Sequence, residues 1–284
     1  VQYGEQGKYD IRFHYNQIPH YRFDDGRTPY GGVGGADLSL PPGWVGANTT
    51  AGMTQFNSTA HNIDIENQRK RYGIGISVHP KRRWKFSLDV KRENRDGLKV
   101  TSGIFGINGG NPAAMIIPEP IDYQTDEINA TLQYAGERTQ VQFGYLGSFF
   151  RDRHSALVWD NAFSDEPAGS SSEWPPAGTS PYAGYPNGEG RLALPPDNEA
   201  HYFSVTAGYD WSDRTRVTGR VRYGILMQND AFLPYTINPN LAVPAGLPRG
   251  SLDGRIEQTL VDLGVTSRLT NKLRLRATFR YDDN

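Results

Sequence analysis

The sequence predicts an all-β protein: a transmembrane antiparallel up-and-down β-barrel, of which this chain supplies about nine strands. Three observations support this fold class. Apolar and polar residues alternate with a period of two in many segments, which indicates strands with two unlike faces. Short and long connections between these segments follow one another in turn, as in outer-membrane barrels. No apolar run approaches the roughly 18 residues that a membrane helix needs.

The alternating segments define the predicted strands in chain order. In the first of them, Tyr9, Ile11, Phe13 and Tyr15 alternate with polar residues. Most of the segments, with their flanks, match the roughly 9–11 residues that a tilted strand needs to cross a bilayer. The predicted strands centre on residues 9–15, 72–78, 84–90, 128–134, 141–145, 203–209, 217–225, 261–265 and 273–281.

The connections between these strands are of two kinds. Tight turns are predicted at 79–82, 135–138, 212–215 and 270–272, and long loops at about 18–65, 95–120, 152–199 and 231–254. Outer-membrane barrels have short periplasmic turns and long extracellular loops, and we expect that orientation here. We interpret residues 1–284 as one barrel domain. We also expect further strands outside this sequence, because bacterial single-chain barrels have even strand numbers and the first predicted strand lacks an upstream hairpin partner.

The composition narrows the possible functions. Aromatic residues make up 12% of the chain, which argues against disorder. The absence of cysteine excludes disulfides, thiolate metal sites and the Cys-x-x-Cys-His attachment of c-type haem, so we expect no cofactor on the chain itself. A formal net charge of −1 gives no attraction to nucleic acid. The six histidines are scattered and show no metal-binding spacing.

A soluble sandwich or propeller would also alternate apolar and polar residues. Its strands would usually be shorter, near 5–6 residues, and its long loops need not fall on one side. Aromatic residues also gather toward both ends of the predicted strands, with Trp84 and Trp211 beside tight turns and Tyr72 and Phe149 toward long loops. Two such belts are typical of membrane barrels. The sequence therefore favours a bacterial outer-membrane location.

Charged residues on the polar face of the predicted strands are the candidate functional residues. The pattern alone favours an ordinary water-filled porin wall or charges that pair with one another. The alternative is a lumen wall that pairs with an inserted partner. The candidates are Arg12, Lys85, Asp89, Lys91, Asp210, Arg220, Arg222, Asp262, Arg274, Arg276 and Arg280, and Asp10 lies on the same predicted face.

Eight segments of the sequence carry a more specific signal. The segments are NQIPH at 16–20, RTPY at 27–30, YGIGISVHPKRRWKFSLDVK at 72–91, PEPIDYQTD at 118–126, GRLALPPDN at 190–198, DAFLPYT at 230–236, LPRGSLDG at 247–254 and FRYDD at 279–283. Each segment alone is short, but their order and spacing follow nearly the whole chain. Together they resemble the MtrB/PioB family of outer-membrane barrels.

The resemblance implies a porin-like scaffold that sheathes a periplasmic multihaem c-type cytochrome and so supports electron transfer across the outer membrane. It also implies that a second, extracellular multihaem cytochrome often docks at the long loops, and that the haem belongs to these partners. The barrel itself would be no enzyme. A general or substrate-specific diffusion porin is the alternative, and an outer-membrane hydrolase is a weaker one, because the sequence shows no Gly-x-Ser-x-Gly nucleophile motif.

Overall fold

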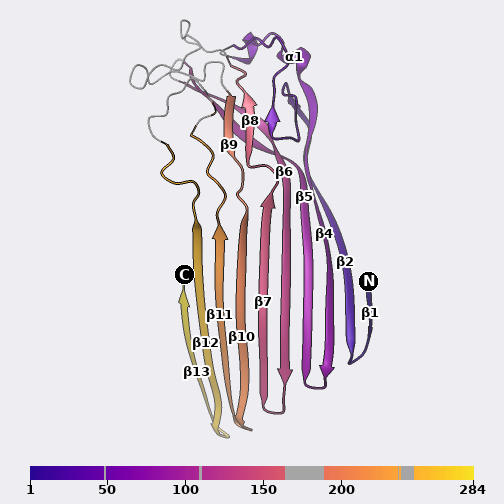
Figure 1. Ribbon diagram of the computed structural model, residues 1–284, viewed down its shortest axis with the longest axis vertical. Coiled ribbons are helices and arrows are strands. Elements are labelled where there is room, and N and C mark those ends of the chain that lie inside the picture. Colours follow the sequence, from indigo (N-terminus) through magenta and orange to yellow (C-terminus); the bar gives the residue numbers. More distant parts are fainter. Residues whose placement is uncertain (48, 109–110, 164–188, 236, 238–245) are drawn as a thin grey trace.

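The computed structural model describes residues 1–47, 49–108, 111–163, 189–235, 237 and 246–284. Its main feature is a ten-stranded sheet in which each strand pairs antiparallel with its neighbours, in the order β1-β2-β4-β5-β6-β7-β10-β11-β12-β13. Figure 1 shows the strands side by side, with tight turns at one end and the longer connections at the other. This up-and-down order is the predicted one.

The strands differ greatly in length. Those of the main sheet are β1 (Gln2–Glu5), β2 (Tyr9–Thr28), β4 (His61–Lys81), β5 (Trp84–Asn108), β6 (Asn111–Ala135), β7 (Thr139–Asp152), β10 (Asn198–Ser212), β11 (Thr215–Gln228), β12 (Gly254–Thr270) and β13 (Leu273–Asp283). A second sheet holds β3 (Asp37–Leu38), β8 (Ala156–Asp160) and β9 (Glu189–Ala193). The described helices are a 3-10 turn at Thr50–Gly52 and α1 (Phe56–Thr59), and neither is long enough to cross a membrane.

All four predicted tight turns are present, and a fifth joins β1 to β2. In this fifth turn the Lys8 N–H donates to the Glu5 carbonyl oxygen at 3.0 Å, and Gly7 takes a φ of 77°. Glycine suits this left-handed conformation because it has no Cβ. The prediction that the first strand lacks an upstream hairpin partner was therefore wrong. The short β1 was missed because four residues offer too little alternation to register as a strand.

One of the predicted long loops is almost entirely strand, and another is shorter than predicted. Residues 95–120, predicted as a loop, belong to a hairpin in which β5 and β6 pair from Trp84↔Tyr134 as far as Asn108↔Asn111. The loop predicted at 18–65 is confined to 29–60, because β2 continues to Thr28 and β4 begins at His61. Backbone hydrogen bonding continues beyond the apolar segments. A strand outside the lipid has no need for an apolar face, so the periodic signal ends before the strand does.

The loop predicted at 152–199 contains β8 and β9, while residues 164–188 of it lie outside the described part. In the connection predicted at 231–254, residues 236 and 238–245 are likewise outside it. The described ends of this connection meet at an isolated bridge between Ala231 and Ser251. The described ends of both connections leave the main sheet at the end opposite the tight turns (Figure 1).

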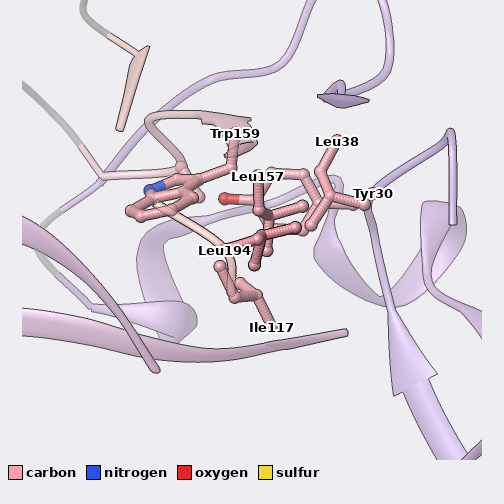
Figure 2. Packing of buried hydrophobic residues seen from close by; sticks show 7 residues of the cluster. Tyr30, Leu38, Ile117, Leu157, Trp159 and Leu194 are labelled. Carbon is pink, nitrogen blue, oxygen red and sulfur yellow. The ribbon is translucent and has the colours of Figure 1, made fainter. Parts of the chain in front are cut away.

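The second sheet and residues 29–60 form a small folded unit at that end, called the cap below. Its centre is a cluster of fully or almost fully buried side chains from four separate parts of the chain, shown in Figure 2. The Tyr30 hydroxyl donates to the Asp160 carbonyl oxygen at 2.8 Å and so joins the first long connection to β8. Ile117 comes from β6, so the long hairpin anchors the cap. The cluster consists of Tyr30, Leu38, Ile117, Leu157, Trp159, Ala162 and Leu194.

Candidate functional site: the polar face of the sheet

One face of the main sheet is apolar across nine consecutive strands. Directly paired residues of an antiparallel sheet share a face, so the register shows which side chains lie together. Most of these side chains are exposed, and Phe143 and Val221 expose 49% and 46% of their surface. An exposed apolar band of this extent indicates contact with lipid rather than water. One row of the band is Tyr9, Val78, Phe86, Leu132, Phe143, Val205, Val221, Val261 and Tyr281.

The apolar band runs obliquely to the hydrogen-bonded rows. Tyr9 begins the apolar run of β2, whereas Tyr281, in the same row, ends the apolar run of β13. If the apolar band lies flat in a bilayer, the strands must therefore be tilted against the membrane normal. Strand tilt with a staggered register is what the closure of a sheet into a barrel requires.

The opposite face carries every candidate residue predicted from the sequence. Four of them, for example, lie in a single row of paired residues. In strand order, this row is Lys85, Gln133, Gln142, Thr206, Arg220, Asp262 and Arg280. Asp210 shares a row with Arg276 through Arg216 and Thr266. Alternation alone thus assigned these side chains to one surface, called the polar face below. Whether they contact a partner is a separate question.

Arg12 and its neighbours form a compact charge cluster on this face. The Arg12 guanidinium lies 3.1 Å from the Asp10 carboxylate and 3.6 Å from that of Asp89. Asp89 is two strands away, and Gly75 lies between them in the same row. A Cβ atom at Gly75 would lie 2.5 Å from Asp89 Oδ1, so the glycine leaves the space through which the two side chains meet. The cluster thus brings one positive and two negative charges together.

Three further ion pairs involve predicted residues. Asp210 accepts from Arg216 at 2.9 Å, and Arg280 lies 3.8 Å from Asp262 and 3.1 Å from Asp282. Sequence reasoning missed Arg216 as a member of the polar face. Arg216 lies an even number of positions from Arg220 and Arg222 on β11, so its side chain is on the same face as theirs. Sequence reasoning also missed Arg268, which pairs in register with Arg274. Both lie next to tight turns, where the apolar alternation that defines a face is ending.

Several predicted residues have no carboxylate within ion-pair distance among the described residues: Lys85, Lys91, Arg220, Arg222, Arg274 and Arg276. The guanidinium of Arg222 lies over the Tyr202 ring, 5.1 Å from its centroid. Such stacking fixes the plane of the guanidinium and leaves its N–H edges free to bind an acceptor. These cations are available to another molecule.

Between the apolar band and the cap, the sheet carries polar groups that are partly or fully buried. Lys99 Nζ lies 2.7 Å from Glu119 Oε1, and the Glu119 side chain is 6% exposed. Burial alone would lower the pKa of Lys99, but hydrogen bonds to Glu119 and Tyr123 raise it overall. Burial is the largest influence on Asp152, at the end of β7, and raises its pKa. Asp152 Oδ1 accepts from the His154 N–H at 3.0 Å, while the buried Oδ2 has no hydrogen-bond partner in the described structure.

We expect Asp152→Asn to stabilise this strand end at pH 7. An acid whose pKa is raised on folding favours the folded state in its protonated form. That contribution is complete below the unfolded pKa of about 3.9 and is lost as the pH rises through the folded value. The asparagine carries no charge at either pH. Protection of nearby amides against hydrogen exchange should therefore exceed that of the wild type at pH 7 and equal it near pH 3. A variant less protected at pH 7 would contradict this account.

Among the described residues, no three His, Cys, Asp or Glu side chains are placed to hold a metal ion. His14, His20, His61, His79, His154 and His201 are spread over several strands and loops. The His201 ring lies within hydrogen-bond distance of Tyr145, whose hydroxyl is 2.9 Å from Nδ1. This contact is an ordinary side-chain hydrogen bond.

Comparison with known proteins places the whole chain in one family. Residues 1–284 match the family model described as "outer membrane beta-barrel porin, MtrB/PioB". The chain is also 30% identical, over all 284 residues, to "Outer membrane protein MtrB" of Shewanella baltica (strain OS185). It spans 36% of the length of that relative, about a third.

Solved structures of outer-membrane proteins are more distant. The ferric-catecholate import receptor Fiu of E. coli K12, in its open form, matches with a TM-score of 0.42 and 10% identity, over 98% of this chain and 45% of that one. The Pseudomonas putida toluene transporter TodX matches with a TM-score of 0.34 and 12% identity, over 98% and 66% of the two chains. Likenesses this loose say nothing of what the chain binds.

Proposed function

This chain belongs to the MtrB/PioB family of outer-membrane β-barrel porins, and on that basis we propose that it forms part of a sheath around a periplasmic multihaem c-type cytochrome. The barrel holds the cytochrome across the outer membrane and insulates its haems from lipid. Electrons then pass between the periplasm and the cell exterior along the partner. The barrel contributes position and insulation and performs no redox chemistry itself.

The observation that carries the proposal is the division of the sheet into an apolar and a polar face. A barrel wall in lipid must satisfy all its backbone groups within the sheet and present an apolar outer surface. The register-matched apolar rows meet the second requirement. The polar face then lines the lumen, where Arg220 and Arg222 can carry charge at the depth of the apolar Val221 without meeting hydrocarbon.

The cap fits the same role at the other end of the strands. Its sheet and buried cluster hold the long connections in one arrangement, with Ile117 fixing them to β6. In a barrel whose long loops face outward, the cap stands at the cell surface. It is then the part of this chain that an extracellular multihaem cytochrome would contact.

Copurification tests the proposal. The full-length protein is purified from outer membranes in mild detergent, and the haem absorbance is followed together with the barrel through size-exclusion chromatography. We expect haem to coelute with the barrel at a constant ratio. The partner should be a c-type cytochrome with several Cys-x-x-Cys-His motifs, since this chain contains no cysteine of its own.

The contrary result is equally clear. A purified barrel that carries no haem and conducts ions in planar bilayers would be a diffusion porin, the alternative that the polar face also permits. In that case the charged side chains would select among solutes in water instead of binding a protein.

A further inference from the structure

The charge on the polar face is unevenly distributed. On β2 to β6, at the level of the apolar band, Asp10, Asp89 and Glu127 balance Arg12, Lys85 and Lys91. On β10 to β13, Asp210, Asp262 and Asp282 face a larger number of arginines. These arginines are Arg216, Arg220, Arg222, Arg268, Arg274, Arg276 and Arg280.

Most of the arginines on β11 to β13 are not neutralised within the described chain. Arg216 pairs with Asp210, and Arg280 lies near Asp262 and Asp282. No carboxylate of the described residues comes within ion-pair distance of the other five. Those five, called the arginine stripe below, are Arg220, Arg222, Arg268, Arg274 and Arg276.

Arg220 and Arg222 show most clearly which charges the sheet itself offers to the arginine stripe. Both lie on β11, whose two neighbouring strands are present. Their cross-strand neighbours are Thr206 and Asp262 for Arg220, and Ser204 and Leu260 for Arg222. Asp262 is nearer to Arg280 than to Arg220, and the neighbours of Arg222 are uncharged. The sheet therefore offers these two guanidinium groups little neutralisation, so any anion that pairs with them must come from the lumen.

Guanidinium groups stay charged at any physiological pH, so the stripe keeps its charge when water is displaced from the lumen. A protein that fills the lumen must either leave these cations unpaired, at high cost, or present anions to them. We propose that the arginine stripe binds a carboxylate-rich face of the sheathed protein, while the balanced strands β2 to β6 face a surface of low net charge. This inference rests on the proposed function and adds the orientation of the partner in the barrel.

The test compares two double variants of the full-length protein. Arg220→Gln with Arg222→Gln removes two positive charges from β11. Thr131→Glu with Gln133→Glu adds two negative charges to β6, so the change in net charge is the same. The control is matched in position, because Thr131 shares a row with Arg222 and Gln133 shares one with Arg220. Each pair lies two residues apart on a single strand.

Haem retained per barrel is measured after washing the membrane-extracted complex with increasing sodium chloride. We expect the arginine variant to lose the haem protein at lower salt than the wild type, with retention about tenfold weaker, as expected for truncating charge pairs at an interface. The β6 control should retain more haem than the arginine variant at each salt concentration, because its added charges face a surface of low net charge. Arg220→Lys with Arg222→Lys keeps the charge and should recover most of the retention. Heat-modifiable migration in gels shows that each variant is folded.

Equal salt curves for the two double variants would overturn the stripe inference and leave the sheath intact. Loss of haem from the β6 control alone would also overturn it. A wild-type barrel without haem, whose conductance loses anion selectivity when Arg220 and Arg222 are replaced, would overturn both proposals and identify the stripe as the filter of a pore.

Discussion

Replacing Leu132 by arginine should destabilise the folded barrel by ~2–4 kcal/mol, whereas arginine at the adjacent Thr131 should have little effect. Leu132 lies in the apolar run of β6, between Phe86 and Phe143, and is 37% exposed. A guanidinium at that depth must enter hydrocarbon or deform the bilayer around it. Thr131 points to the polar face, where the new side chain meets the lumen.

The measurement is urea-induced unfolding of the purified barrel in lipid vesicles, followed by heat-modifiable migration. The two variants differ by one position in the chain and introduce the same side chain, so they separate the effect of the face from that of charge or size. Similar losses of stability at both positions would show that the face assignment is wrong. The membrane interpretation of the sheet would then also be wrong.

Alternation predicted the membrane part of this fold well, for a physical reason. Lipid on one side and water on the other impose a period of two on every strand that crosses the band. The strand register confirms the predicted apolar face. Apolar residues that were predicted separately for each strand are paired across the sheet: Ile76 pairs with Ile11 on one side and with Leu88 on the other. The placement of the charged residues on one face follows from the same rule.

Beyond the band, the sequence was a poor guide. Residues 95–120 contain Pro118 and Pro120 and lack clear alternation, which is typical of a loop, yet they pair as strands. Proline lacks an N–H and usually interrupts a ladder. Both prolines are buried at the base of the cap, so tertiary contacts hold the segment in place. The Arg12–Asp89 ion pair was also beyond prediction, since it depends on side-chain reach across Gly75 rather than on spacing along the chain.

The cap was the largest feature that the sequence did not reveal. Its strands are two to five residues long, and its core joins Tyr30 and Leu38 to Leu157 and Leu194 across more than a hundred residues of chain. No local pattern records contacts over such separations, because each segment contributes only one to three apolar side chains. Their meeting depends on the β5–β6 hairpin, which provides the surface on which they pack.

Leu157→Ala should therefore unfold the cap while leaving the barrel intact. Leu157 is completely buried, and its truncation removes apolar contacts and leaves a cavity, at a cost of about 2–5 kcal/mol. A unit with so small a core has little stability to lose. Hydrogen exchange at β8 and β9 should rise strongly, with β10 and β11 unchanged. Val45→Ala, at a 57% exposed position of the same cap, should change neither. Exchange that rises equally in cap and barrel would show that the two unfold together, so that the cap supports the wall instead of resting on it.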